Sequence, residues 1–226
     1  MSDSNKICFI TCVNDEECYA ESLLYLKNLF IPRGMDIEFL PIRGAKSMTS
    51  GYNAAMKMTN AKYKVYLHQD IFLMKKDYVD ILLKIFQTDE KIGLIGHAGA
   101  YKLPTSGVWW QGEKLYGRVA HSYAPESLRR TDYGCHVEGD FVDLEVVDGL
   151  IMATQYDIPW REDLFTGWHF YDISQSFEFK RTGLRVVIPR QDDIWCVHAC
   201  GNKELKDDYW RYRQIFLNEY EKELLD

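Results

Sequence analysis

The first half of the chain alternates apolar, β-prone runs with amphipathic segments, and this alternation limits the folds that the chain can adopt. Residues 7–13 form a continuous apolar run, which is typical of a strand covered on both faces. Residues 18–30 carry apolar side chains at helical spacing, with Asn14 or Asp15 before them as the N-cap. Residues 36–42 form a second β-prone run. A strand, a helix and a strand in this order predict a parallel pair joined by a right-handed crossover.

The same alternation continues to residue 96. It predicts a helix over residues 47–58, a strand over 64–67, a helix over 77–86 and a short strand over 91–96. Strands and helices that alternate in this way are typical of a doubly wound sheet, whose first half binds a nucleotide in many enzymes.

The second half of the chain breaks the pattern. Residues 97–139 are rich in glycine and aromatic side chains, and they predict a long loop or a β-excursion, which is often functional. The elements expected after it are a strand pair over residues 143–154, a helix over 168–181 that Gly183 caps, strands over 184–189 and 194–199, and a polar-rich helix over 205–225.

Composition and charge exclude several classes of protein. The formal net charge is −7 and no basic stripe is present, which argues against a nucleic-acid partner. The chain has no signal peptide and no apolar run of ~18 residues, so we expect a cytoplasmic protein without a transmembrane segment. Its six cysteines are then expected to be reduced thiols.

The strand over residues 64–67 ends in His68, Gln69 and Asp70. In open α/β sheets, ligands bind outside the carboxyl ends of the strands. An imidazole and a carboxylate at that position suit a divalent cation and, through it, a phosphate. The alternative is that His68 and Asp70 only cap the following turn.

A second cluster of metal-binding residue types is the stretch Cys196-Val197-His198-Ala199-Cys200. In a strand, the two cysteines and the histidine would share one face. However, no second cysteine–histidine pair has the spacing of a zinc finger. We therefore expect small buried thiols around one histidine rather than a zinc site.

Several short motifs occur in an informative order along nearly the whole chain. They are Tyr66-Leu67-His68-Gln69-Asp70, Val147-Asp148-Gly149, Trp168-His169-Phe170-Tyr171-Asp172-Ile173 followed by Gly183, and His198. Together they resemble the GT-A glycosyltransferases that use nucleotide sugars, in particular the family 2 type, and most of all the streptomycin-biosynthesis StrF-like glycosyltransferase domain.

The resemblance implies a fold and a domain organisation. The fold is α/β of the GT-A type, also called the nucleotide-diphospho-sugar transferase fold. It is doubly wound, with a mostly parallel mixed sheet and helices on both faces. A single domain would span residues 1–226, with a nucleotide-binding half over 1–100, an acceptor half over 101–204 and a C-terminal helix over 205–226.

The resemblance also implies a site for Mn²⁺ or Mg²⁺. Asp70 matches the last aspartate of the family's Asp-x-Asp motif, which binds the metal, and His198 matches a late histidine that completes the metal shell. An imidazole ligand suits Mn²⁺ better than Mg²⁺. His68 stands where the family has its first aspartate, and it would face the ribose or the phosphates instead. Taken alone, a histidine at position 198 is more often a buried core residue.

Asp172 is the candidate general base that the resemblance implies. The family has an acidic pair at the start of a helix, and in this chain Tyr171 takes the place of the first acid. Glu162 and Asp163 are nearby rivals for the role. The alternative for Asp172 is a helix N-terminal acid that only interacts with the helix dipole.

The nucleotide and the donor sugar are expected to contact the ends of several strands. The residues that the resemblance assigns to them are Thr11, Cys12, Val13, Asn14, Arg43, Gly51, Asn53, His68, Asp70 and Asp148. Each has a simpler alternative, since exposed arginines are common, the serine- and threonine-rich start of a helix is often only a cap, and Asp148-Gly149 is also a good turn.

The function that follows is the transfer of a sugar from a nucleoside diphosphate sugar, with a UDP-sugar favoured, to an acceptor hydroxyl. Inversion at the sugar is implied by the family alone. Trp109, Trp110 and Trp168 are candidates for stacking on a carbohydrate acceptor, although tryptophans also fill cores. The alternative is a non-catalytic nucleotide- or sugar-binding domain, because two family acids are replaced. A nucleotidyltransferase is disfavoured, because residues 11–17 contain no glycine-rich basic loop.

The C-terminal helix has an aromatic stripe formed by Tyr209, Tyr212, Ile215, Phe216 and Tyr220. Such a stripe either packs on the rest of the domain or forms a homodimer contact. Packing on the domain is the favoured interpretation.

Overall fold

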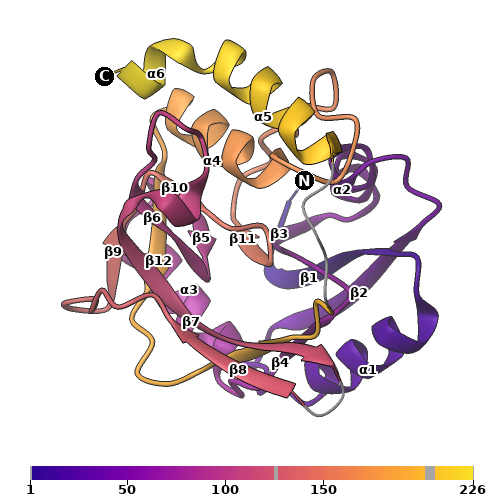
Figure 1. Ribbon diagram of the computed structural model, residues 1–226. Helices are drawn as coiled ribbons and strands as arrows, with labels where there is room; N and C mark the ends of the chain where they lie inside the picture. Colours follow the sequence, from indigo (N-terminus) through magenta and orange to yellow (C-terminus); the bar gives the residue numbers. More distant parts are fainter. Residues whose placement is uncertain (1, 125–126, 202–206, 226) are drawn as a thin grey trace.

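Two β-sheets lie side by side and share the helices around them (Figure 1). The computed structural model describes residues 2–124, 127–201 and 207–225. Within these ranges the first sheet has seven strands, in the spatial order β2 (Asp36–Arg43), β1 (Asp3–Val13), β3 (Ala61–Leu67), β11 (Ile151–Thr154), β5 (Ile92–Gly96), β12 (Arg185–Pro189) and β9 (Phe141–Asp143).

The first sheet is mixed but mostly parallel. β1 pairs in parallel with β2 and with β3, as the strand–helix–strand pattern predicts. β11 runs antiparallel between β3 and β5, and β9 runs antiparallel to β12 at the edge, so the remaining strands of this sheet share one direction. Their carboxyl ends therefore meet at one edge, where ligands bind in such folds.

The helices cover both faces of this sheet. Successive residues of a strand point to opposite faces. In β1, Ile7 and Phe9 pack with residues of α1 and α3, whereas Cys8 and Ile10 pack with residues of α2 and α4. The predicted doubly wound arrangement is confirmed. The bounds of these helices are α1 (Glu16–Lys27), α2 (Met48–Met58), α3 (Tyr78–Thr88) and α4 (Tyr171–Arg181).

The break in the pattern at residues 97–139 is a β-excursion. In the described residues it contributes to a second sheet, whose strands are, in spatial order, β10 (Val146–Val147), β6 (Ala98–Lys102), β7 (Glu113–Ala124), β13 (Cys196–His198) and β4 (Ile71–Leu73). A further strand, β8 (Ser127–Asp132), pairs with the second half of β7. A short 3-10 helix, η1 (Trp109–Gln111), precedes β7. β13 pairs with both β4 and β7, and His198 thereby lies opposite Ile71 and His121.

The strand pair and the helix predicted within residues 143–181 differ from the observed elements. The predicted strand pair over residues 143–154 is divided, because β9 joins the first sheet, β10 joins the second and only β11 lies as expected. The helix expected from residue 168 begins at Tyr171. Phe170 has a φ of 62°, which is left-handed and cannot continue a right-handed helix. Residues 168–170 therefore lie before the helix and are not part of it.

The C-terminal segment packs on α4, as favoured from the sequence (Figure 1). It is divided into α5 (Asp207–Glu219) and α6 (Glu221–Leu225), and residues 205 and 206 of the predicted helix lie outside the described ranges. The Phe216 ring lies 5.5 Å from the Phe177 ring of α4, and Tyr209 lies 4.9 Å from Phe170. None of the helices described here is long and apolar enough to cross a membrane.

His97 is a buried histidine at the junction of the two sheets, between β5 and β6. It is 1% exposed, and its Nε2 lies 3.3 Å from the carbonyl oxygen of Arg118. Its Nδ1 has no hydrogen-bond partner among the described residues, so a second ring proton would have no acceptor. Burial lowers the pKa of His97 to about 4.

This lowered pKa predicts a contribution to acid sensitivity. In the unfolded chain the imidazole takes up its proton near pH 6.5, so between pH 6.5 and 4 the unfolded state binds more protons than the folded state. Between pH 7 and pH 5, the free energy of unfolding of the wild type should fall by ~2 kcal/mol relative to that of His97→Gln. Urea unfolding of both proteins at several pH values in this range measures their free energies of unfolding. Titrating groups other than His97 contribute equally to both proteins, so their effect cancels in the difference. Parallel pH dependences would contradict the assignment.

Candidate functional site

A cavity of about 580 Å³ opens at the carboxyl ends of β1 and β3, beside the start of α4. It gathers residues that lie far apart in the sequence. The residues singled out from the sequence that line it are Cys12, Val13, Asn14, His68, Asp70, Trp109, Trp110, Asp148, Trp168, Asp172 and His198. The cavity is large enough for a drug-sized or nucleotide-sized ligand.

Two imidazoles and one carboxylate converge at one end of this cavity. The Oδ1 atom of Asp70 lies 3.5 Å from Nε2 of His198 and 3.9 Å from Nδ1 of His68. The donor atoms of the three residues all lie within 4.8 Å of one another. Asp70 is 8% exposed, and its carbonyl oxygen accepts a hydrogen bond of 2.9 Å from the Ala199 amide, which holds the end of β13 beside it.

The chemistry of this donor set fits a divalent cation. One carboxylate oxygen with two imidazole nitrogens is a set that Mn²⁺ accepts and that Mg²⁺, which prefers oxygen ligands, accepts less well. Three protein ligands leave positions at the metal for oxygen atoms of a ligand in the cavity. His68, which stands at the position of an acid in the resembling family, thus lies in the same group as Asp70 and His198.

Tyr171 is a site residue that the sequence did not single out for a role. Its hydroxyl lies 2.5 Å from Nε2 of His68 and forms a hydrogen bond with it. This bond fixes the orientation of the His68 ring through the nitrogen other than Nδ1, which is the one near Asp70. Tyr171 is 3% exposed and packs against Tyr52 and Trp160. A Cβ atom at Gly149 would overlap the phenol ring, so the glycine leaves the space that Tyr171 occupies. His68 and Tyr171, the two residues that stand where the resembling family has acids, therefore contact each other.

Asp172, the second residue of α4, lies in the cavity wall and is partly exposed to it. Its Oδ2 accepts a hydrogen bond of 2.9 Å from the Gly149 amide. Burial, and then the negative charge of Asp148, raise the pKa of Asp172 to about 7. A carboxyl with such a pKa can exchange a proton near neutral pH.

The rivals for the role of Asp172 do not reach the cavity. Asp163 is exposed and pairs with Arg161 at 2.8 Å, and Glu162 is exposed as well. Neither lines the cavity, so Asp172 is the acid of this segment that faces it.

The end of β1 and the turn after β3 are tied together beside His68, Asp70 and His198. Oε1 of Gln69 accepts hydrogen bonds from the amides of Asn14 and Asp15, at 2.9 and 3.1 Å. Asp15 also caps α1 through its side chain. Cys12, Val13 and Asn14 thereby form one wall of the cavity, next to Asp70. Gln69 is a second residue for which the sequence offered no signal beyond its place in the triplet.

Four residues assigned to nucleotide binding lie away from the cavity lining. Thr11 is 1% exposed inside β1. Arg43 is exposed and forms a two-fold ion pair with Glu16, at 2.5 and 2.8 Å. Gly51 lies behind Cys12, where a Cβ atom would be 2.5 Å from the Cys12 thiol, so the glycine allows α2 to pack closely on β1.

The fourth of these residues, Asn53, is bonded to the backbone of Trp160. Its Nδ2 donates to the Trp160 carbonyl and its Oδ1 accepts from the Trp160 amide, both at 2.9 Å. The serine-rich start of α2 forms a capping box between Ser47 and Ser50. The cap expected as the simpler alternative is thus present, and nucleotide binding by Gly51 and Asn53 stays a prediction.

Aromatic side chains form another part of the cavity wall. Trp110 and Trp168 are 40% and 42% exposed, whereas Trp109 is 4% exposed and packs on Tyr133. Tyr209 reaches the same wall from α5, and only the tertiary structure reveals its place there. Trp110 and Trp168 thus expose surface on which a ligand could stack, and the buried Trp109 packs against Trp110.

Comparisons with known proteins agree with this geometry. The model of the "glycosyltransferase like family" matches residues 8–220. A comparison with curated protein sequences finds none that is significantly similar.

Similar solved structures share the fold. They include the mannosyltransferase PcManGT from Pyrobaculum calidifontis in complex with GDP-Man and Mn²⁺, with a TM-score of 0.58 and 13% identity over 98% of this chain and 64% of that chain. GalNAc-T7 with UDP, GalNAc and Mn²⁺ has a TM-score of 0.68 and 9% identity over 99% of this chain and 49% of that chain. S. aureus TarS 1-349 has a TM-score of 0.55 and 8% identity over 86% of this chain and 60% of that chain.

The chain thus spans between about half and two thirds of the length of these structures. At such low identity the likeness shows the fold alone, and that fold is the expected GT-A fold. The likeness to the StrF-like domain stays a prediction. The match over residues 8–220 shows that the chain belongs to the glycosyltransferase-like family.

Proposed function

We propose that this protein transfers a sugar from a nucleoside diphosphate sugar to an acceptor hydroxyl with the help of a divalent cation. The observation that carries the proposal is the meeting, in one cavity, of a metal-binding group and a carboxyl with a pKa of about 7. Metal and diphosphate would lie at the group formed by His68, Asp70 and His198. The acceptor would lie between Asp172 and the exposed tryptophans.

The nucleotide-binding half, residues 1–100, would hold the donor. The backbone of Cys12, Val13 and Asn14 offers hydrogen-bonding groups beside the metal-binding group, where the base and ribose would lie. When bound, Mn²⁺ would neutralise the charge that develops on the leaving diphosphate. Asp148, at the turn before β11, would face the donor sugar. We favour a UDP-sugar, and UDP is bound in the structure of GalNAc-T7.

The acceptor half, residues 101–204, would position the attacking hydroxyl. Asp172 would accept its proton as the oxygen attacks the sugar, which inverts the configuration at the reacting carbon. The Gly149 amide holds one oxygen of this carboxylate in the cavity wall. Trp110 and Trp168 would stack on the acceptor from the opposite wall.

A non-catalytic binding domain is the second candidate. It rests on the two acids that are replaced in the family motifs, at His68 and Tyr171. The contact between these residues argues against a decayed site, because the imidazole keeps a metal-binding nitrogen directed toward Asp70 while the phenol holds the other nitrogen.

A donor screen tests the proposal directly. The protein is incubated with Mn²⁺ and a series of UDP- and GDP-sugars, and the released nucleoside diphosphate is measured. Asp70→Asn should lower the metal-dependent rate by at least ~100-fold, because the loss of a partner that only orients a metal ligand already costs ~10–100-fold. Asp77→Asn, which removes a half-exposed carboxylate that pairs with Lys75 and does not line the cavity, serves as the control. Binding of UDP and Mn²⁺ without turnover of any donor would favour the binding domain.

The raised pKa of Asp172 predicts the pH dependence of kcat/KM. A base must be unprotonated, so the rate should fall as the pH drops below about 7, by ~10-fold per pH unit. Asp172→Asn should lower the rate by ~100- to 10,000-fold and leave Mn²⁺ binding intact, whereas Asp163→Asn should retain the pH profile. Normal turnover by Asp172→Asn would exclude this base.

The contact between Tyr171 and His68 predicts a role in metal affinity. Tyr171→Phe removes only the hydroxyl and should weaken Mn²⁺ binding by ~10-fold, as measured by calorimetry, because His68 loses the partner that orients its ring. Tyr52→Phe is a matched control, because this neighbouring buried tyrosine contacts the Leu67 carbonyl instead. Equal Mn²⁺ affinity in Tyr171→Phe and the wild type would show that Tyr171 does not orient the ligand.

A further inference from the structure

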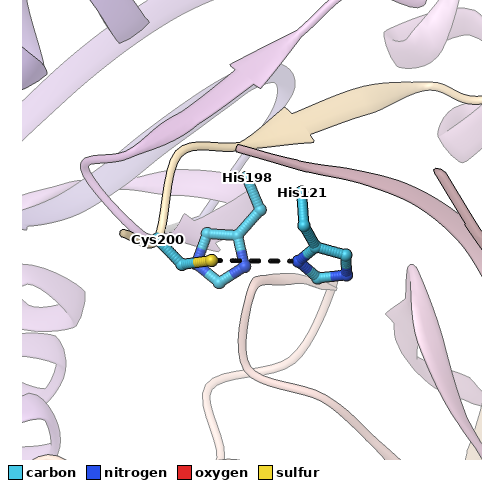
Figure 2. A group of neighbouring side chains, drawn as sticks. All are labelled: His121, His198 and Cys200. Atoms are coloured by element: carbon cyan, nitrogen blue, oxygen red, sulfur yellow. Dashed lines mark hydrogen bonds between the residues drawn. The ribbon is translucent and has the colours of Figure 1, made fainter. Parts of the chain in front are cut away.

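His198 also belongs to a second cluster of side chains of metal-binding types. Figure 2 shows His121, His198 and Cys200 directed toward one another. The Cys200 Sγ atom lies 4.0 Å from Nδ1 of His121, and the rings of His121 and His198 are 5.6 Å apart. One donor atom from each of the three residues lies within 4.8 Å of the other two.

Backbone pairing holds this cluster in place. The parallel register of β13 and β7 sets His198 directly opposite His121. Beyond the end of β13, the Ala199 amide donates to the Asp70 carbonyl at 2.9 Å, and the Gly201 amide donates to the Ser122 carbonyl at 3.2 Å. Cys200 lies between these two residues, whose amides are hydrogen-bonded to neighbouring chain segments. These bonds fix the backbone of Cys200 so that its thiol lies beside the two imidazoles.

The donor types in this cluster differ from those around Asp70. A thiolate with two imidazoles is a soft set that zinc prefers, whereas the carboxylate at Asp70 suits harder cations. Zinc bonds of about 2.3 Å to sulfur and about 2.0–2.1 Å to nitrogen place tetrahedral ligands about 3.3–3.6 Å apart. The observed separation of 4.0 Å between Sγ and Nδ1 needs only a small adjustment of side chains to reach this geometry.

The sequence suggested a different grouping and favoured buried thiols over a zinc site. It placed Cys196, His198 and Cys200 on one face of a strand, without a second pair to complete a zinc site. In the structure, Cys196 is buried beside His97, with its Sγ atom 3.4 Å from Nε2 of that residue. The third donor is His121, which comes from the neighbouring strand.

We propose that His121, His198 and Cys200 bind Zn²⁺, and that this zinc competes for His198 with the cation at Asp70. A neutral imidazole offers one acceptor nitrogen at a time, because its other nitrogen carries the proton. His198 can therefore serve either cation but not both. On binding zinc, the Cys200 thiol would release its proton to solvent, and water would fill the fourth position of the metal.

The competition rests on the proposed function, because it assumes the site at Asp70, but zinc binding itself can be tested separately. Co²⁺ is used as the probe in the full chain, because thiolate ligation gives it a charge-transfer absorption band. The band should form in the wild type and in Asp70→Asn, and it should be absent in Cys200→Ser. Cys135→Ser, which removes another partly buried thiol, should keep it.

Zinc affinity is then measured by competition with a chelating dye. His121→Ala and Cys200→Ser should each bind Zn²⁺ at least ~10-fold more weakly than the wild type. A thiolate band that persists in Cys200→Ser, or an unchanged zinc affinity in both variants with circular dichroism like that of the wild type, would overturn the zinc site.

The competition has its own readout. Mn²⁺ titrated into the cobalt-loaded wild type should reduce the thiolate band, and it should not do so in Asp70→Asn. A band in the wild type that Mn²⁺ leaves unchanged would overturn the shared use of His198. If transfer activity is found, Zn²⁺ should inhibit it at concentrations at least ~10-fold higher in His121→Ala than in the wild type, each compared with its own zinc-free rate. A Cys200-dependent band without turnover of any donor would support the zinc site and contradict the proposed transferase.

Discussion

The pairing of β13 with β4 and β7 is the interaction on which the whole site depends. This pairing places His198 of β13 beside Asp70, which lies at the turn after β3. The hydrogen bond from the Ala199 amide to the Asp70 carbonyl fixes the end of β13 in this position. The same pairing sets His198 beside His121. The imidazole of His198 is therefore common to the group with the Asp70 carboxylate and the group with the Cys200 thiol. The proposed competition between two metals follows from this shared residue of β13.

The site also shows how two departures from a family pattern can be one structural feature. An imidazole at position 68 presents a second nitrogen, which needs a partner in a half-buried place, and the phenol of Tyr171 supplies it. The phenol needs space beside Gly149, and the Gly149 amide in turn holds Asp172. The metal-binding group and the proposed base are thus joined through neighbouring residues of one helix start and one turn.

Much of the first sheet could be predicted, because each of its early elements has a local signal. The apolar run of β1, the cap at Asp15 and the helical spacing in α1 depend on neighbours in sequence. The second sheet could not be predicted, because its strands come from four separate parts of the chain and their pairing is a long-range choice. The partners of Arg43 and Asn53 could not be predicted either. Arg43 pairs with Glu16 and Asn53 bonds to the Trp160 backbone, so neither side chain lines the cavity.

The sequence by itself determined the alternation of strands and helices, the polar triplet at the end of β3 and the acid at the start of α4. These follow from hydrophobic periodicity and from the chemistry of single side chains, which are local properties. Only the tertiary structure decided which of these residues share a cavity, how the pKa of Asp172 is raised and which donors surround His198. Those outcomes depend on burial and on distances between residues remote in sequence, and they arise only when the two sheets are in place.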